Sequence, residues 1–218
     1  MANVLVIGAH GKVGQLVVND LVEAGDNVYA GFRDPNQFET IETADRLNPV
    51  LFDLSQSAEK MAKVMIDYKI EQVVFSAGAG GKGGDARTTQ VDLDGAAKTM
   101  EAAETAKVRH YVMVSAAGAD DREIWVKSGI YTYFMMKHYA DRLLTQSKLS
   151  YTILRPTALT DEAASGRVGI LSGAHDYASS VSRADVALMI VAALHQKEKK
   201  NQIVAFTSGD EEIKDVFQ

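Results

Sequence analysis

Short apolar runs alternate along this chain with longer segments in which apolar residues recur every three or four positions. The short runs are apolar at nearly every position, which is typical of strands buried on both faces of a parallel sheet. Seven runs predict strands, at Val4–Ile7, Asn27–Phe32, Val50–Phe52, Gln72–Phe75, His110–Ser115, Tyr151–Leu154 and Gln202–Phe206.

The segments between these runs have the periodicity of helices. The clearest is Val13–Ala24, which Gly25 ends. Further helices are predicted at Ala58–Tyr68, Thr88–Ala106, Thr132–Ser147 and Ala184–His195. Strands and helices in alternation form right-handed βαβ units. We therefore expect one α/β domain over residues 1–218, a Rossmann-type doubly wound parallel sheet of about seven strands.

One stretch departs from this alternation. Residues 156–181 are rich in Gly, Ala, Ser and Thr. We expect them to form, with residues 207–218, a small C-terminal cap over the carboxyl ends of the strands. This cap would lie on the substrate side of the same domain.

A glycine-rich turn joins the first predicted strand to the first predicted helix. Its glycines have GxxGxxG spacing. Glycines at such a turn let the backbone approach a pyrophosphate, and the following helix offers free N–H groups and the positive end of its dipole. This context predicts a dinucleotide site, with cofactor-binding residues at Gly8, His10, Gly11, Lys12, Val13 and Gly14.

The end of the second predicted strand bears on the choice of cofactor. An acidic residue there would bind the ribose hydroxyls of NAD, whereas this chain has Arg33 followed by Asp34. The Arg33 guanidinium suits a 2′-phosphate, and Lys12 would add positive charge. We therefore expect NADP(H) to be preferred, with NAD(H) as the alternative if Asp34 binds the ribose instead.

The next two strand ends supply further candidate contacts. Asp53, followed by Leu54, would accept a hydrogen bond from the adenine amino group, or else serve as a turn or helix-capping residue. The small residues Ser76, Ala77 and Gly78 would let the cofactor cross the sheet edge. The glycine-rich segment that follows, Gly80–Gly84, contains Lys82. A P-loop would have Ser or Thr directly after this lysine, whereas this chain has Gly83, so the segment predicts a flexible rim of the site.

Composition excludes several function classes. A net charge of −6 argues against a nucleic-acid partner. No apolar run approaches the roughly eighteen residues of a membrane span, and the start of the chain lacks the basic region of a secretory signal. We therefore expect no membrane partner and a cytoplasmic location.

A metal site is not expected either. The chain has no cysteine, and its histidines lack metal-ligand spacing. His10 lies in the glycine turn, where it would approach phosphate. The remaining histidines are expected at the surface or at helix ends, and they are His110, His138, His175 and His195.

Several short motifs resemble the atypical short-chain dehydrogenase/reductase superfamily, and within it the small NmrA-like and biliverdin reductase B-like NAD(P)-binding proteins. The resemblance covers essentially the whole chain. The motifs that carry it are Gly8–Gly14, Val112–Ser115, Leu154–Pro156, Ser182–Ala187 and Thr207–Asp210. It implies a Rossmann fold and NAD(P) binding, but no single substrate.

The resemblance also implies a catalytic pair. The superfamily uses a YxxxK motif, which matches Tyr133 and Lys137 in a predicted helix. The lysine would lower the pKa of the tyrosine and hold the nicotinamide ribose, while the tyrosine would transfer the proton. Ser115 is the remaining candidate catalytic residue, but the position where the family places its catalytic serine holds Ala116.

The segment after the sixth predicted strand also matches the family. Pro156 and Thr157 would lie near the nicotinamide carboxamide. The role of Arg155, which could form an ion pair, stays open.

These residues support three hypotheses. The first is an NADP(H)-dependent reductase of a small carbonyl, quinone or flavin-like acceptor. The second is a non-catalytic dinucleotide-binding regulator of the NmrA-like type, which Ala116 favours. An epimerase or dehydratase of nucleotide sugars is the third, although such enzymes usually have a larger substrate domain. The partner would be a small-molecule substrate, and the protein a monomer or homodimer.

Overall fold

A computed structural model describes residues 1–41, 44–81, 83–172, 179–198 and 201–218. Its main sheet has eight strands in the order β3-β2-β1-β4-β5-β6-β10-β8. The strands are β1 (Asn3–Ile7), β2 (Asn27–Phe32), β3 (Leu47–Leu51), β4 (Gln72–Phe75), β5 (His110–Val114), β6 (Tyr151–Pro156), β8 (Arg167–Ile170) and β10 (Gln202–Glu212). All neighbours are parallel except β8, which runs antiparallel to β10. The predicted Rossmann-type sheet is confirmed, with one added antiparallel strand.

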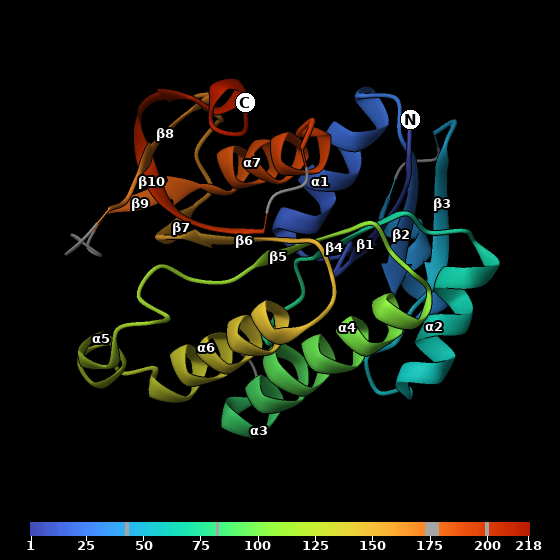
Figure 1. The fold of residues 1–218 in the computed structure, drawn as a ribbon, viewed down its shortest axis with the longest axis horizontal. Coiled ribbons are helices and arrows are strands. Elements are labelled where there is room, and N and C mark those ends of the chain that lie inside the picture. Colours follow the sequence, from blue (N-terminus) through green and yellow to red (C-terminus); the bar gives the residue numbers. More distant parts are fainter. Residues whose placement is uncertain (42–43, 82, 173–178, 199–200) are drawn as a thin grey trace.

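Helices cover both faces of this sheet. The helices are α1 (Lys12–Glu23), α2 (Ala58–Asp67), α3 (Gly84–Thr88), α4 (Ala96–Thr105), α5 (Arg122–Lys127), α6 (Tyr131–Gln146) and α7 (Arg183–His195). Short helical turns are η1 (Pro35–Thr40), η2 (Thr89–Gly95) and η3 (Ile213–Asp215). α1 and α7 lie on one face, whereas α2, α4 and α6 lie on the other (Figure 1).

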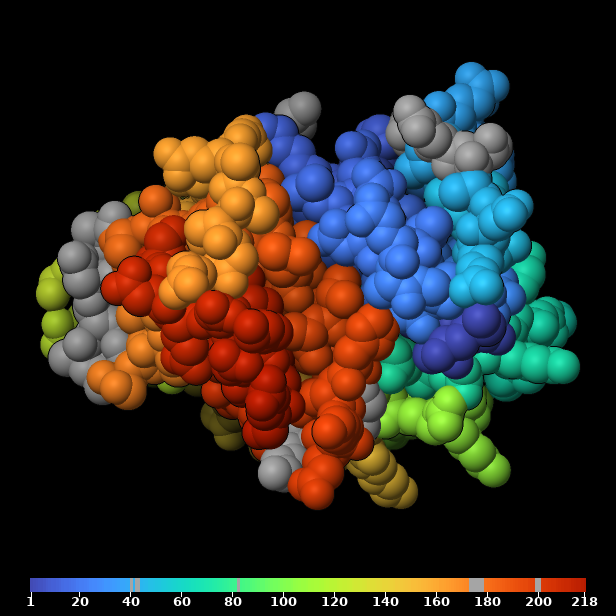
Figure 2. Space-filling view, turned by 90° about the horizontal axis from the view of Figure 1, so that it is seen from above, coloured from blue at the N-terminus to red at the C-terminus, as the bar shows by residue number. Residues whose placement is uncertain are grey.

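The two apolar cores follow from the alternation of side chains along the strands. In β1, Val4 and Val6 face the core under α1 and α7, whereas Leu5 and Ile7 face the core under α2, α4 and α6. Seen from above, α1 and α7 form one surface together with the C-terminal segment (Figure 2). No helix in the described part of the chain is long and apolar enough to cross a membrane.

The third strand differs from its prediction. β3 runs from Leu47 to Leu51, not over Val50–Phe52. It lies at the sheet edge and, within the described residues, pairs only with β2, so Asn48 and Pro49 are tolerated there and interrupt the apolar run. Asp53 consequently lies beyond the strand and not at its last position.

The third helix begins earlier than predicted and is not uniform. It begins with α3 at Gly84, passes through the π-helical turn η2 and continues as α4. A π turn adds one residue per turn and so rotates the side chains that follow. Here it places Asp92 in the interior, with 1% of its surface exposed.

The region expected to form a cap contains strands that the sequence did not predict. β7 (Ala158–Thr160) pairs with β9 (Ser180–Ser182) in a separate two-stranded sheet, while β8 joins the main sheet. β10 continues past the predicted end at Phe206 to Glu212, so residues 207–212 belong to a strand. Residues 173–178 lie outside the described residues, as does Lys82 of the predicted glycine rim.

Candidate functional site

The glycine turn is a tightly packed corner between β1 and α1. Gly8 has a φ of +91°, and its carbonyl accepts a hydrogen bond from Gly11 N at 2.9 Å. A Cβ atom on Gly14 would lie 2.2 Å from that carbonyl oxygen, and one on Gly8 would lie 2.7 Å from Ala77 N. Glycine is therefore required at both positions by the packing of the turn itself.

The start of α1 fits an anionic group. The first N–H groups of any helix lack an intrahelical acceptor, and here the N-cap residue, Gly11, provides no side-chain cap for them. By contrast, Ser57 caps α2 and Ser182 caps α7 through their hydroxyl groups. Free N–H donors and the positive dipole end at α1 suit the pyrophosphate of a dinucleotide.

A cleft of about 1230 Å³ lies beside this turn, at the carboxyl ends of the central strands. It brings together predicted site residues from five segments of the chain. These residues are Val13, Ser76, Ala77, Gly78, Ser115, Tyr133, Lys137, Pro156 and Thr157. A second hollow, of about 1220 Å³ between α7 and the C-terminal segment, is lined by none of them. The cleft is therefore the candidate active site.

Lys137 is fixed by a buried carboxylate that the sequence analysis missed. Its Nζ lies 3.0 Å from Asp92 Oδ1 and donates to the carbonyl of Val114 at 3.1 Å. The other oxygen of Asp92 accepts from Ala79 N at 3.0 Å. Burial lowers the pKa of Lys137, but the charge and hydrogen bond of Asp92, together with Tyr133 and Asp141, outweigh it and the net shift is upward. Lys137 is therefore a firmly positive ammonium.

A signal for Asp92 was present in the sequence. It lies between Val91 and Leu93 in a helical segment with a buried face. A charged residue within such a face requires a partner. The sequence did not show that a π turn would direct it toward Lys137.

Tyr133 lies one helical turn before Lys137 and lines the cleft. Its ring centroid is 5.7 Å from Lys137 Nζ, and the ring packs edge-on against Phe134. Desolvation has the largest effect on the pKa of the Tyr133 phenol and raises it. Lys137 lowers this pKa as expected, whereas Asp92 and Asp141 raise it. The net shift is upward because desolvation of the phenol is a larger effect than that of Lys137. Tyr133 is a neutral hydroxyl suited to donate a proton.

Ser115 lines the cleft next to Ala116, but its hydroxyl oxygen is buried. Its hydroxyl has no hydrogen-bond partner of ordinary geometry in the described residues. It is nevertheless close enough to the Asp141 carboxylate to lower the pKa of Asp141. Burial has the larger effect and raises the pKa of Asp141 overall. The hydroxyl that would polarise a substrate carbonyl is missing at Ala116, which lines the cleft.

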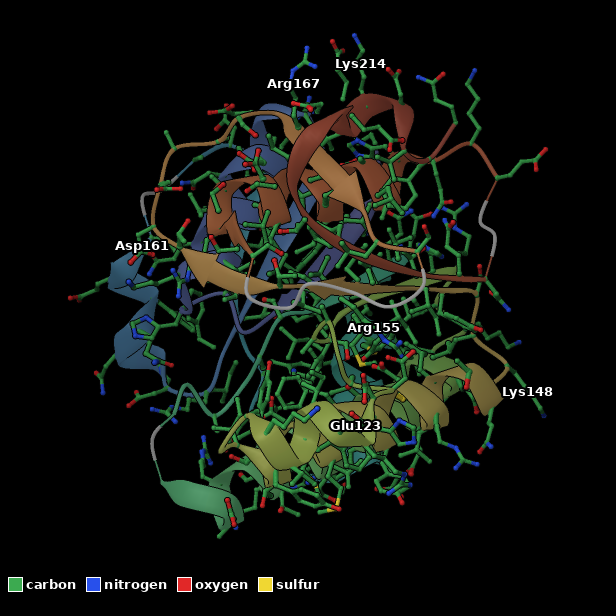
Figure 3. All side chains as sticks on the ribbon, turned by 90° about the vertical axis from the view of Figure 1, so that its left-hand side faces the viewer. Glu123, Lys148, Arg155, Asp161, Arg167 and Lys214 are labelled. Carbon is green, nitrogen blue, oxygen red and sulfur yellow. The ribbon has the colours of Figure 1, made fainter. Side chains whose placement is uncertain are left out.

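Arg155, whose role the sequence left open, forms an ion-pair network. Its Nε donates to Asp141 at 2.8 Å, and its Nη1 donates to Asp120 at 2.6 Å. Figure 3 shows Arg155 just above the helix layer that contains α6. Arg155 thus supports the site from behind and joins β6 to α6.

Arg33 is exposed after β2, at the expected position for the adenosine ribose. Asp34 accepts a hydrogen bond from Asn36 N at 2.9 Å and caps η1, so its carboxylate already has a structural role.

Asp53 folds into a turn in which it accepts from Ser55 N and Ser55 Oγ, at 2.9 and 2.6 Å. Burial raises the pKa of Asp53, but the Ser55 hydrogen bonds and the charges of Arg33 and Arg87 lower it overall. Arg87, which the sequence analysis did not consider, therefore shares this corner. The next residue, Leu54, packs against the core cluster under α2 and α4.

Lys12 has an acidic partner, and one histidine lies in the interior. Lys12 lies in the glycine turn, but its ammonium pairs with Asp161 Oδ2 at 2.5 Å. His110 is fully buried and contacts the hydroxyls of Ser150 and Thr152, contrary to the expected surface position.

The remaining histidines lie in varied surroundings. His138 packs on Trp125, and His195 ends α7. His10 is exposed in the glycine turn, whereas His175 lies outside the described residues. Those residues include no group of three acidic or histidine side chains that could hold a metal ion.

Comparisons with known proteins agree with this geometry. Residues 8–197 match a family described as NAD(P)H-binding. The chain is 37% identical over 217 residues to the uncharacterized sugar epimerase YhfK of Bacillus subtilis, covering 99% of this chain and 98% of that one.

Two solved structures share the whole fold. The oxidoreductase ylbE of Lactococcus lactis has a TM-score of 0.86 at 29% identity, with coverage of 99% of this chain and 94% of that chain. A putative NAD-dependent epimerase/dehydratase of Bacillus halodurans has a TM-score of 0.89 at 29% identity, with coverage of 100% and 99%.

Proposed function

Because this chain belongs to the NAD(P)H-binding family and has the fold of the atypical short-chain dehydrogenases/reductases, we propose that it is an NADP(H)-dependent reductase. Its acceptor would be a small carbonyl, a quinone or a flavin-like molecule. The observation that carries this proposal is the Tyr133–Lys137 pair, held by Asp92 in the cleft beside the open start of α1.

Each residue of the site has a distinct part in this proposal. A bound reduced nicotinamide would supply the hydride. The N–H groups at the start of α1 bind phosphate, and Lys137, fixed by Asp92, donates to a ribose hydroxyl. Tyr133, a neutral phenol, donates the proton that the reduced acceptor requires.

The residue at 116 favours particular acceptors. An alanine methyl group cannot polarise a carbonyl, and the Ser115 hydroxyl is buried. Conjugated acceptors such as quinones and flavins take hydride without that polarisation. We therefore place them ahead of simple ketones and aldehydes.

NADP preference would rest on Arg33. Replacing Arg33 with Ala should weaken NADPH binding roughly tenfold, because a charge-assisted contact to the 2′-phosphate is lost, and should leave NADH binding nearly unchanged. Calorimetric titration with both nucleotides measures this. Arg142→Ala, which removes an exposed arginine on α6, is the control. Equal losses for NADPH and NADH would contradict the assignment.

Two other functions fit some of the same observations. Ala116 favours a dinucleotide-binding regulator without turnover. The name of YhfK and the Bacillus halodurans relative favour an epimerase or dehydratase.

The deciding experiment titrates the protein with NADPH and NADH. It then follows NADPH oxidation with quinones, flavins and small carbonyls, and product formation from a nucleotide sugar. Turnover of an acceptor supports the reductase, binding without turnover supports the regulator, and isomerised sugar supports the epimerase. If neither nucleotide binds, all three are wrong.

A further inference from the structure

Asp161 joins three segments at the edge of the candidate site. Its carboxylate pairs with Lys12 Nζ at 2.5 Å and with Arg183 Nη1 at 2.6 Å. Lys12 is the first residue of α1, Arg183 is the first residue of α7, and Asp161 directly follows β7. Figure 3 shows Asp161 beside the end of α1 at which that helix begins.

This cluster is exposed. The side chains of Lys12 and Asp161 are 68% and 60% exposed, against 23% for Arg183. Exposed ion pairs contribute little to folding stability and exchange partners readily. The hydrogen bond from Lys12 lowers the pKa of Asp161, as does the charge of Arg183, so Asp161 is an anion at neutral pH.

The cluster lies next to the end of α1 at which an anion would bind. The N–H groups at the start of α1 have no side-chain cap, and Lys12 carries the nearest cation in sequence to them. An anion bound at that helix end and Asp161 would both attract the Lys12 ammonium. Leu159, two residues before Asp161, lines the cleft, so the contact ties the cleft wall to the glycine turn.

We propose that Lys12 is a phosphate-binding residue of the dinucleotide site and that Asp161 is an internal anion that competes for it. Arg183 retains Asp161 when Lys12 turns to the phosphate. The proposal rests on the dinucleotide binding proposed above. Binding of the dinucleotide then releases the link between the glycine turn and the segment after β7.

Double-mutant calorimetry tests this competition. Asp161→Asn should raise the affinity for NADPH and for NADH about two- to fivefold, since both contain the pyrophosphate and exposed charge pairs have effects of this size. Lys12→Met should lower both affinities. In the Lys12→Met background, Asp161→Asn should have no further effect, because the residue for which Asp161 competes is gone.

A matched control separates this effect from a change in net charge. Asp67→Asn also removes an exposed acid paired with a lysine, Lys63, on α2. It should change neither affinity. Thermal unfolding of each variant shows whether the fold is retained.

The outcomes separate the two proposals. If the wild-type protein binds neither nucleotide, the dinucleotide function fails and the competition fails with it. If it binds them but Asp161→Asn weakens binding, or strengthens it equally with and without Lys12, only the competition is overturned.

Discussion

At the residue scale, burial and the charges of Lys137 and Asp92 together determine the protonation state of Tyr133. A lysine without a partner would stabilise a phenolate and lower the tyrosine pKa. Here desolvation of the phenol is larger than the effect of Lys137, and the buried carboxylate, 3.0 Å from the ammonium, raises the pKa of Tyr133 further. The tyrosine is therefore a proton donor over the ordinary pH range, which suits reduction better than alcohol oxidation.

This protonation state predicts a pH profile. A phenol whose pKa is raised from 10.0 is fully protonated below that value and loses its proton only as the pH rises through the raised pKa. We expect kcat/KM for reduction to show little loss from Tyr133 deprotonation up to about pH 9, one unit below the unshifted pKa. Steady-state assays across this range measure it, and an alkaline loss near neutrality that Tyr133→Phe removes would contradict it.

Removal of the phenol hydroxyl tests the same residue directly. Tyr133→Phe should lower kcat by about 10²- to 10⁴-fold, the usual contribution of a positioned acid, while NADPH affinity stays within twofold. Tyr139→Phe, on the exposed side of the same helix, is the control. Unchanged turnover in Tyr133→Phe would leave hydride donation as the only chemical step that the protein assists.

At the scale of elements, the glycine turn has two kinds of glycine. Gly14 leaves no room for a side chain, because a Cβ added there would lie 2.2 Å from the Gly8 oxygen. A Cβ on Gly11 would lie 3.2 Å from the same atom. Gly14→Ala should therefore shift the turn, destabilise the fold by about 1–3 kcal/mol and abolish dinucleotide binding.

Gly11→Ala is the matched comparison for that substitution. It should leave the unfolding free energy within about 1 kcal/mol of wild type, since its closest contact needs to move by only a few tenths of an ångström. Urea unfolding and nucleotide titration of both variants measure the difference. Equal destabilisation would contradict the distinct role of Gly14.

The elements also show what the sequence could and could not predict. The central strands and α1 were predictable because both faces of β1 and β4 are buried, which requires continuous apolar runs. The bounds predicted for β3 were displaced because an edge strand tolerates exposed polar residues and so has no continuous apolar run. β7 and β9 were missed because strands of three residues have no recognisable period.

The candidate site divides in the same way. The glycine turn and Tyr133 with Lys137 are local patterns with fixed spacing. Tyr133 and Lys137 line the cleft together with Val13 of the turn. Asp92 and Asp161 act through contacts with residues far away in the chain. The sequence signals that Asp92 needs a partner, because it lies in a buried helical face, but which residue that partner is depends on the folded arrangement. Asp161 has no such local signal.

At the scale of the whole molecule, Arg155 joins β6, α6 and the loop after β5. Replacing it with Met would leave Asp141 buried without its cation. We expect a loss of about 3–5 kcal/mol in the free energy of unfolding. Arg167→Met breaks an exposed pair with Glu212 and should cost less than about 1 kcal/mol. Similar losses in urea unfolding would contradict the structural importance of Arg155.

The strand order has a consequence for the chain as it is synthesised. β6 ends at Pro156, but the strand that pairs with its outer edge, β10, begins only at Gln202. While the ribosome adds the intervening residues, a strand already placed beside β5 presents free N–H and C=O groups to other nascent chains. Such an edge is a template for association between chains. Slow translation between these two strands would lengthen that exposure, and fast translation would shorten it.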